Sequence, residues 1–209
     1  MAAPRPSTGI YGGSFNPIHL GHTTLGRWLV QQGYLDELWF LVSPQNPFKP
    51  AAGLLSDAAR LRLARLAVQD DAAGQRLRVS DFECHLPRPS FMVHTLAALR
   101  VAYPERDFVL VIGADNWLRF PQWHHAEEIL RHHRLIIYPR PGYPIDAASL
   151  PAGVTLVDTP LLDISSTQIR QAIASDPAYD GRWLSPLVWQ EIRQQGFYAQ
   201  TPKTLAANP

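Results

Sequence analysis

The sequence predicts an α/β fold in which helices cover both faces of a parallel sheet. Three observations support this prediction: short apolar runs alternate with segments of helical spacing, several runs are apolar at nearly every position, and a glycine turn follows the first run. Strands that alternate with helices form parallel sheets, and strands buried on both faces are continuously apolar. We expect the 209 residues to form a single domain, 1–209, with a sizeable core.

Hydrophobic spacing assigns each element. A helix follows the glycine turn, because residues 25–30 have helical apolar spacing, and a later helix has Ser56 or Asp57 as its N-cap. Residues 200–209 have little apolar content, so we expect a flexible tail. The expected strands lie at residues 9–11, 38–42, 77–82, 108–112, 135–138 and 154–157, and the later helices at 56–68, 91–101, 126–130, 165–174 and 186–194.

Charge and composition exclude several classes of protein. The net charge is +1, so no basic field indicates a nucleic-acid partner. No apolar run approaches the roughly 18 residues of a membrane span, and the N-terminus lacks the apolar core of a signal peptide. We therefore expect a protein that binds neither nucleic acid nor membranes.

Cysteine and histidine usage bears on compartment and metals. The single cysteine, Cys84, cannot form an intramolecular disulfide, which fits a reducing compartment, so we expect a cytoplasmic protein. Cys84 lies in a segment that we interpret as a strand beside carboxylates, a setting that disfavours a thiolate, so a structural role is expected. No cysteine pair and no HExxH accompany the eight histidines, so we expect no metal held by protein ligands alone.

The most informative segment is GGSFNPIHLGH, residues 12–22. Gly12 and Gly13 allow the backbone to approach a bulky anion, and the N–H groups at a helix start attract phosphate. His19 and His22 are three positions apart, so they share one face once the helix has begun. The alternative is a glycine turn with two surface histidines, but the full motif after a first strand favours phosphate chemistry.

A second phosphate element is expected at DISSTQIR, residues 163–170. Ser165 and Gln168 form a capping-box pattern, so a well-capped helix is the structural alternative. Three consecutive hydroxyls exceed what capping needs, and Arg170 lies one turn into the helix, where a guanidinium can bind phosphate with two donors. Lys49 is a third candidate in a proline-rich loop after the second strand, with a solvated lysine as the alternative.

These two motifs resemble those of the nucleotidylyltransferase superfamily, GGxF(D/N)PxHxGH near the N-terminus and ISSTxIR near the other end. The segments between them resemble the bacterial nicotinate mononucleotide adenylyltransferases. Residues 86–96 resemble that family's PSYTxDTL, residues 111–117 with Trp123 resemble its IGxD…W segment, and residues 138–142 resemble its RPG loop. The resemblance covers residues 9–198 and implies a Rossmann-like nucleotidylyltransferase fold.

The resemblance also implies an activity and its residues. ATP would donate its adenylyl group to nicotinate mononucleotide, giving nicotinate adenine dinucleotide and pyrophosphate on the route to NAD, with Mg²⁺ bound mainly through ATP. The catalytic residues implied are His19, His22, Lys49 and Arg170. The implied ATP and phosphate contacts are Gly12, Gly13, Ser14, Phe15, Ser165, Ser166 and Thr167. The implied pyridine-nucleotide contacts are Asn16, Thr95, Asp115, Trp117, Trp123 and Arg140.

Within the pyridine site, the resemblance implies that Trp123 stacks on the ring and that backbone N–H groups near Thr95 and Trp123 hold its carboxylate. A core tryptophan is the alternative for Trp123, and an N-cap is the alternative for Asp115. Met92 and His94 replace a threonine and an aspartate of the family pattern, and nicotinate remains the expected substrate.

Two other functions stay open at this point. A phosphopantetheine adenylyltransferase shares both phosphate motifs, but it gives no reason for the GADNW…W segment. A nucleotide-binding regulator without catalysis would have little need for the four catalytic candidates. The expected partners are the two substrates, and the chain could form a homo-oligomer.

Overall fold

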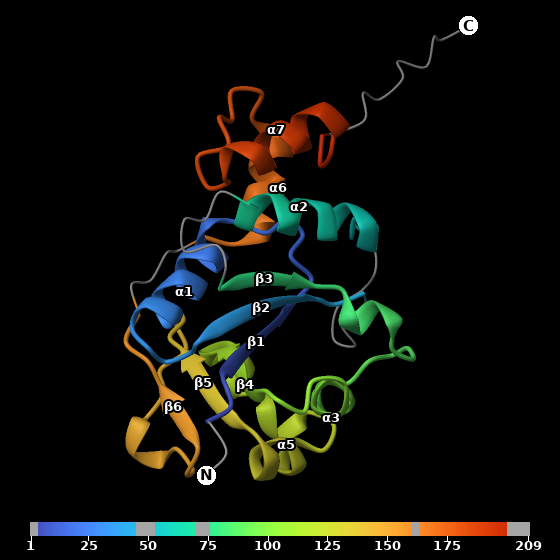
Figure 1. Cartoon of the computed structure of the whole chain (residues 1–209). Helices are drawn as coiled ribbons and strands as arrows, with labels where there is room; N and C mark the ends of the chain where they lie inside the picture. The colour runs from blue at the N-terminus through green and yellow to red at the C-terminus, as the bar shows by residue number, and fades with distance from the viewer. Residues whose placement is uncertain (1–3, 45–52, 70–75, 160–163, 200–209) are drawn as a thin grey trace, which may run out of the picture.

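A six-stranded parallel sheet forms the centre of the computed structural model, which describes residues 4–44, 53–69, 76–159 and 164–199 (Figure 1). The strand order is β3-β2-β1-β4-β5-β6, and every neighbouring pair is parallel. The predicted α/β class is therefore confirmed. The strands are β1 Ser7–Gly13, β2 Glu37–Val42, β3 Leu77–Ser80, β4 Asp107–Gly113, β5 Arg134–Tyr138 and β6 Val154–Leu156.

Helices cover both faces of the sheet (Figure 1). One buried cluster joins the sheet to α1 Leu20–Gln31, α2 Asp57–Gln69, α6 Ser166–Ser175 and α7 Pro186–Gln195. The other cluster joins it to α3 Met92–Ala102 and α5 Ala126–His132. The short elements are α4 Ala114–Trp117 and the 3₁₀ turns η1 Phe82–His85, η2 Phe120–Gln122 and η3 Ala147–Ser149.

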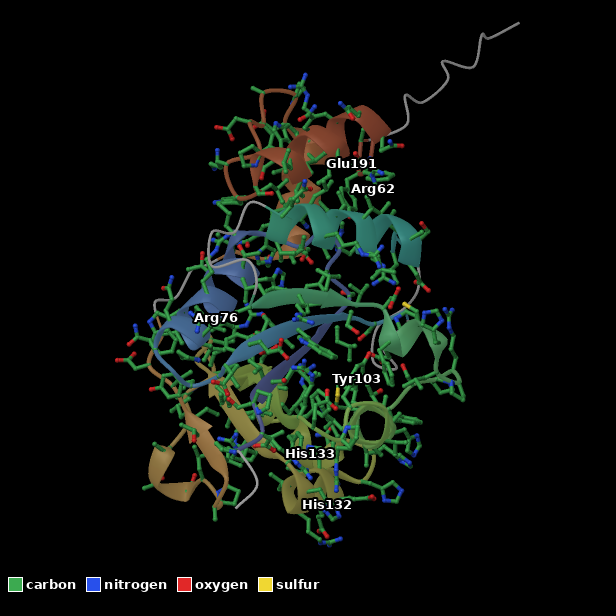
Figure 2. All side chains as sticks on the ribbon, in the orientation of Figure 1. Arg62, Arg76, Tyr103, His132, His133 and Glu191 are labelled. Carbon is green, nitrogen blue, oxygen red and sulfur yellow. The ribbon has the colours of Figure 1, made fainter. Side chains whose placement is uncertain are left out.

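The alternation of side chains along β4 explains the two clusters. Val109 and Val111 belong to one cluster, whereas Leu110 and Ile112 belong to the other. Successive residues of a strand point to opposite faces, so an apolar run serves both layers at once. On the α2 side, Arg62 pairs with Glu191 of α7 at 2.6 Å and joins these two helices (Figure 2).

Two local expectations need correction. The strand predicted at 77–82 ends at Ser80, because the Ser80 hydroxyl accepts the N–H of Phe82 at 3.2 Å and turns the chain. Cys84 consequently lies in η1 and not in a strand. Burial raises the pKa of the Cys84 thiol, and the thiol donates to the Val42 carbonyl at 3.6 Å. The predicted structural role of Cys84 agrees with this environment.

Helix starts clarify two further expectations. Ser56 caps α2, because its hydroxyl accepts the N–H of Ala59 at 3.2 Å. Asp115 is the second residue of α4, whose N-cap is Gly113, so Asp115 is not an N-cap. In the ranges that the structure describes, no helix is long and apolar enough to cross a membrane.

The strand order places a ligand crevice between β1 and β4. The chain moves from β1 through β2 to β3 on one side, and from β4 through β5 to β6 on the other. Open parallel sheets bind ligands beyond the carboxyl ends of the strands at this point of reversal. Gly13 ends β1 and Gly113 ends β4, so the predicted glycine turn lies directly at the crevice.

Candidate active site

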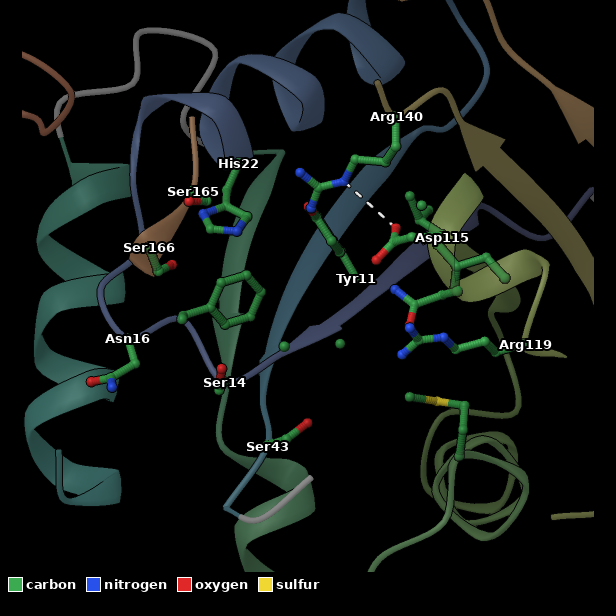
Figure 3. Close-up of a pocket in the computed structure, with 18 of the residues that line it drawn as sticks. Tyr11, Ser14, Asn16, His22, Ser43, Asp115, Arg119, Arg140, Ser165 and Ser166 are labelled. Atoms are coloured by element: carbon green, nitrogen blue, oxygen red, sulfur yellow. Dashed lines mark ion pairs between the residues drawn. The ribbon is translucent and has the colours of Figure 1, made fainter. Parts of the chain in front are cut away.

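A cavity of about 770 Å³ opens at the carboxyl ends of β1 and β4 (Figure 3). Its walls come from the glycine turn, the loop after β2, the segment after β4, the end of β5 and the start of α6. The cavity therefore gathers residues from both ends of the chain. The predicted residues that line it are Gly12, Gly13, Ser14, Phe15, Asn16, His19, His22, Asp115, Trp123, Arg140, Ser165, Ser166, Thr167 and Arg170.

The two histidines lie together at the start of α1. His19 is the N-cap residue, and its ring centroid is 3.7 Å from that of His22. The Nδ1 atom of His22 accepts the N–H of His19 at 3.2 Å, which ties the side chain to the helix start. The three-residue spacing thus brings both imidazoles to one place, as the sequence predicted.

His19 is held in a neutral form. Its side chain is 5% exposed, and its Nδ1 atom has no hydrogen-bond partner among the described residues. Burial, and secondly the positive charge of Arg140, lower the pKa of His19 to about 3. A neutral imidazole can donate from one ring nitrogen and accept at the other, so His19 can meet a phosphate oxygen without carrying charge.

The start of α6 forms the capping box that the sequence predicted. The Ser165 hydroxyl accepts the N–H of Gln168 at 3.2 Å, and the Ser165 N–H donates to Gln168 Oε1 at 2.8 Å. Ser166 and Thr167 are the first residues of the helix, where N–H groups have no acceptor within the helix. Both residues line the cavity, so this helix end is suited to bind an anion.

Two side-chain bonds join the phosphate motifs across the fold. The Ser166 hydroxyl donates to the Pro17 carbonyl at 2.8 Å, across 149 positions of sequence. The Arg170 guanidinium donates to the Asn16 carbonyl at 2.8 Å and to the Thr167 hydroxyl at 3.3 Å. Arg170 therefore holds the two motifs together, and it also lines the cavity as a fixed cation.

Asn16 lines the cavity and also has partners inside the protein. Its side chain is 4% exposed. Its amide nitrogen donates to the Gly53 carbonyl at 2.9 Å, and its Oδ1 atom accepts the N–H of Leu55 at 3.3 Å and the Tyr198 hydroxyl at 2.8 Å. These bonds leave one amide hydrogen for a ligand. An ionised aspartate here could not donate to Gly53.

Phe15 supports the site with its ring. The residue is 3% exposed, and its ring packs edge-on against Tyr11 and Phe40, each at 5.7 Å between centroids. The backbone of Phe15 has a φ of 44°, in the left-handed region. Phe15 nevertheless lines the cavity, and its contact with phosphate stays a prediction.

A polar network closes the side of the cavity near β5 (Figure 3). Arg140 Nε lies 3.6 Å from Asp115 Oδ1, and Arg140 Nη2 donates to the Tyr138 hydroxyl at 3.4 Å. The hydroxyls of Tyr138 and Tyr11 are 2.9 Å apart. Burial raises the pKa of both tyrosines, so both stay protonated. Sequence reasoning missed these tyrosines, since each is the aromatic member of an apolar strand.

The structure does not bring Thr95 and Trp117 to the cavity. Thr95 is fully buried and its hydroxyl donates to the Phe91 carbonyl at 3.3 Å, while Trp117 stacks on Phe120 at 5.4 Å. The N–H of Thr95 also donates to Phe91, and the N–H of Trp123 donates to Phe120. The amides of Thr95 and Trp123 themselves are thus engaged in local turns, and the carboxylate site that the resemblance implied, at backbone N–H groups near these two residues, stays a prediction. Trp123 itself is half-buried and lines the cavity.

Several lining residues were missed from the sequence. Near Trp123 they are polar and lie in or just after the GADNW segment, which is the only signal that could have indicated them: Asn116, Arg119, Gln122 and His124. Glu83, another lining residue, accepts the hydroxyls of Ser90 at 2.5 Å and Ser43 at 2.9 Å. Burial raises the pKa of Glu83. Lys49 lies outside the described residues.

The sequence of this chain is similar to a known family and to named bacterial proteins. The cytidylyltransferase-like family matches residues 10–172. The chain is 52% identical to a protein of Bacteroides thetaiotaomicron named "probable nicotinate-nucleotide adenylyltransferase", over 90% of this chain and 91% of that protein. A protein of the same name from Bacteroides fragilis is 48% identical, over 91% of this chain and 93% of that one.

The fold is also similar to that of a solved structure. The nicotinic acid mononucleotide adenylyltransferase of Plasmodium falciparum, complexed with NaAD, aligns with a TM-score of 0.80. The alignment covers 92% of this chain and 97% of that one at 20% identity. This likeness supports the sheet order and helix arrangement described above.

Proposed function

The chain belongs to the cytidylyltransferase-like family, as a nicotinate-nucleotide adenylyltransferase, and from this premise we propose how its residues transfer the adenylyl group of ATP to nicotinate mononucleotide. An oxygen of the 5′-phosphate attacks the α-phosphorus of ATP. The bond from that phosphorus to the β-phosphate oxygen breaks, and pyrophosphate leaves. The observation that carries this mechanism is the junction of both phosphate motifs at one cavity, through Ser166 and Arg170.

The protein's contribution is positioning and charge stabilisation. The attacking phosphate is already ionised, so the reaction requires no general base. Catalysis then depends on alignment of the two nucleotides and on donors directed at the oxygens where negative charge develops. The cavity offers two kinds of donor: backbone N–H groups at helix starts, and the side chains of fixed cations.

We assign the triphosphate to the side of the cavity between α1 and α6. His22 donates to the oxygens that gain charge, and His19 supports it as a neutral ring. Arg170 and the amides at the start of α6 hold the leaving pyrophosphate. Lys49 is proposed to add a second cation to the same group, on the basis of its resemblance to the family's basic loop residue.

We assign nicotinate mononucleotide to the side near Trp123. The half-buried indole offers an aromatic face for the pyridine ring. Because the amides of Thr95 and Trp123 are engaged, the carboxylate is proposed to meet side chains there, with Arg119 and Gln122 as the donors. His94 is exposed, and its ring lies 5.4 Å from that of His124 at the cavity wall.

ATP would bring Mg²⁺, which lowers the negative charge on the phosphate oxygens. Within the described ranges, no group of three or more His, Cys, Asp and Glu side chains could hold a metal ion. These residues fit a Mg²⁺ ion that is coordinated mainly by ATP oxygens and water. Asp115 lines the cavity, and within the described residues its buried Oδ1 atom has no hydrogen bond and only the ion pair with Arg140 at 3.6 Å, so it is the residue that would hold the ion.

Pyrophosphate release tests this function. The assay supplies Mg·ATP with nicotinate mononucleotide, nicotinamide mononucleotide or phosphopantetheine in separate reactions. Preference for the nicotinate compound is the expected result. Preference for nicotinamide mononucleotide would make Met92 and His94 candidates for a changed specificity, and turnover with phosphopantetheine alone would overturn the choice of acceptor. ATP binding without any pyrophosphate release would indicate a regulator.

A further inference from the structure

Arg60 is a fully buried cation that belongs to none of the groups assigned above. It lies in α2, and 0% of its side chain is exposed. A buried guanidinium destabilises a fold unless its donors are bonded and its charge is paired. Its partners therefore indicate what this side chain does.

The guanidinium joins the loops after the first two strands. Arg60 Nη1 donates to the Ser14 carbonyl at 2.6 Å and to the Ser43 carbonyl at 2.8 Å. Arg60 Nη2 donates to the Pro44 carbonyl at 3.4 Å, and Nε donates to the Leu55 carbonyl at 3.0 Å. Ser14 and Ser43 both line the cavity, so the guanidinium of Arg60 bonds to two segments of the cavity wall.

The bond to Ser14 fixes one peptide plane of the glycine turn. In a trans peptide the C=O and the following N–H point in opposite directions. When Arg60 holds the Ser14 carbonyl, the N–H of Phe15 is therefore directed away from the guanidinium. The φ of 44° at Phe15 is costly for a bulky residue, so surrounding contacts must maintain this turn.

A carboxylate fixes the guanidinium in turn. Asp57 Oδ1 pairs with Arg60 Nη2 at 2.6 Å, and Asp57 Oδ2 pairs with Arg88 Nη2 at 2.8 Å. Arg88 lies in the loop that leads to Ser90, another residue of the cavity wall. Arg60 thus has its charge paired, and its position is set by a second loop of the site.

We propose that Arg60 is a positioning residue for adenylyl transfer: it holds the Ser14–Phe15 peptide in the orientation that presents the Phe15 N–H to the phosphates of ATP. Arg60 acts through the glycine turn and does not touch substrate. The inference rests on the proposed function, since it takes ATP to be the ligand of this turn.

The test compares Arg60→Lys with Arg62→Lys on the same helix. Lysine keeps the charge near Asp57, but a single ammonium cannot span the carbonyls that the guanidinium joins. Arg62 also makes a carboxylate pair, with Glu191, but it lies away from the cavity. Per folded molecule, we expect Arg60→Lys to lower kcat/KM for ATP by roughly tenfold or more, about 1.4 kcal/mol in the barrier. The KM for nicotinate mononucleotide should change far less, and Arg62→Lys should match the wild type.

A purely structural Arg60 would give another result. In that case Arg60→Lys would lower the unfolding temperature while leaving the ATP kinetics of the folded fraction at the wild-type value, which would overturn the proposal. Should Arg60→Lys fail to fold, Asp57→Asn takes its place with Asp81→Asn as control, because Asp81 pairs with the exposed Arg65. A raised KM for ATP in Asp57→Asn alone supports the proposal, and an unchanged KM overturns it.

Calorimetric titration with ATP alone separates this proposal from the proposed function. A wild type that binds ATP and turns over no acceptor would refute the function. Weaker ATP binding by Arg60→Lys than by Arg62→Lys would still support the positioning role. Equal ATP affinity of the two variants, together with equal kinetics, would overturn it.

Discussion

Replacing His19 with glutamine is expected to remove part of the acid sensitivity of the fold. In the folded protein, burial and then the charge of Arg140 lower the pKa of His19 to about 3. In the unfolded chain the pKa of a histidine is about 6.5. Between these two values the unfolded chain binds more protons than the folded one, so the free energy of unfolding falls as the pH falls through this window.

The two pKa values set the size of this effect. Each unit of pH below the unfolded pKa costs about 1.4 kcal/mol until the folded pKa is reached. At about pH 4.5, some two units below 6.5, the fold should have lost roughly 2–3 kcal/mol through His19 alone. That amount is a large fraction of the stability of an ordinary domain. Glutamine cannot titrate, so His19→Gln should lack this loss.

Urea unfolding across the acidic range measures the difference. The free energy of unfolding is determined for the wild type, His19→Gln and His132→Gln from about pH 7.5 to about pH 4.5. His132 is exposed at the end of α5 (Figure 2), so its variant should keep the wild-type slope. His133, whose pKa is lowered chiefly by burial, contributes equally in the wild type and His19→Gln, and the charge of His132 is only a minor cause of its lowered pKa. Parallel losses in the wild type and His19→Gln would refute a neutral, buried His19.

Three further substitutions test the site. His22→Ala should lower kcat by about 10²-fold or more, the scale for loss of a preorganised donor, with the circular dichroism spectrum unchanged; near-normal turnover would remove His22 from the mechanism. Trp123→Ala should weaken the binding of nicotinate mononucleotide by roughly tenfold, since base–aromatic stacking contributes about 1–3 kcal/mol, while calorimetry with ATP changes little; equal loss for both ligands would indicate a packing role. Tyr198→Phe removes the hydroxyl that donates to Asn16 at 2.8 Å, and it should lower the free energy of unfolding in urea by about 1 kcal/mol; a wild-type value would contradict that hydrogen bond.

The elements and the two phosphate motifs could be predicted because their signals are local. The capping box at Ser165 needs only residues three positions apart, and the pairing of His19 with His22 depends on one helical turn. Successive apolar side chains of β4 point to opposite faces of the sheet, so its apolar run directly indicates burial on both faces. The strand predicted to reach residue 82 failed for a local reason as well, since a serine–backbone bond ends it at Ser80.

The site residues were harder to predict where a side chain has distant partners. Asn16 binds Tyr198 across 182 positions, and Arg60 binds Ser14 across 46. A polar residue that is already bonded inside the protein cannot bind a ligand with the same atoms, and no sequence pattern records those bonds. For the same reason the N–H of Thr95 itself, which donates to the Phe91 carbonyl, has no hydrogen left for a ligand.

The sequence by itself determined the α/β class, the glycine turn, both helix starts and the family to which they belong, because these depend on spacing and residue type over a few positions. Only the tertiary structure decided three features of the site. Ser166 and Arg170 donate to the carbonyls of Pro17 and Asn16. His19 is buried beside Arg140, and Arg60 donates to the Ser14 carbonyl of the glycine turn. These contacts join segments far apart in the chain. They arise when the sheet order brings the carboxyl ends of β1 and β4 together, and burial then decides which polar atoms remain for substrate.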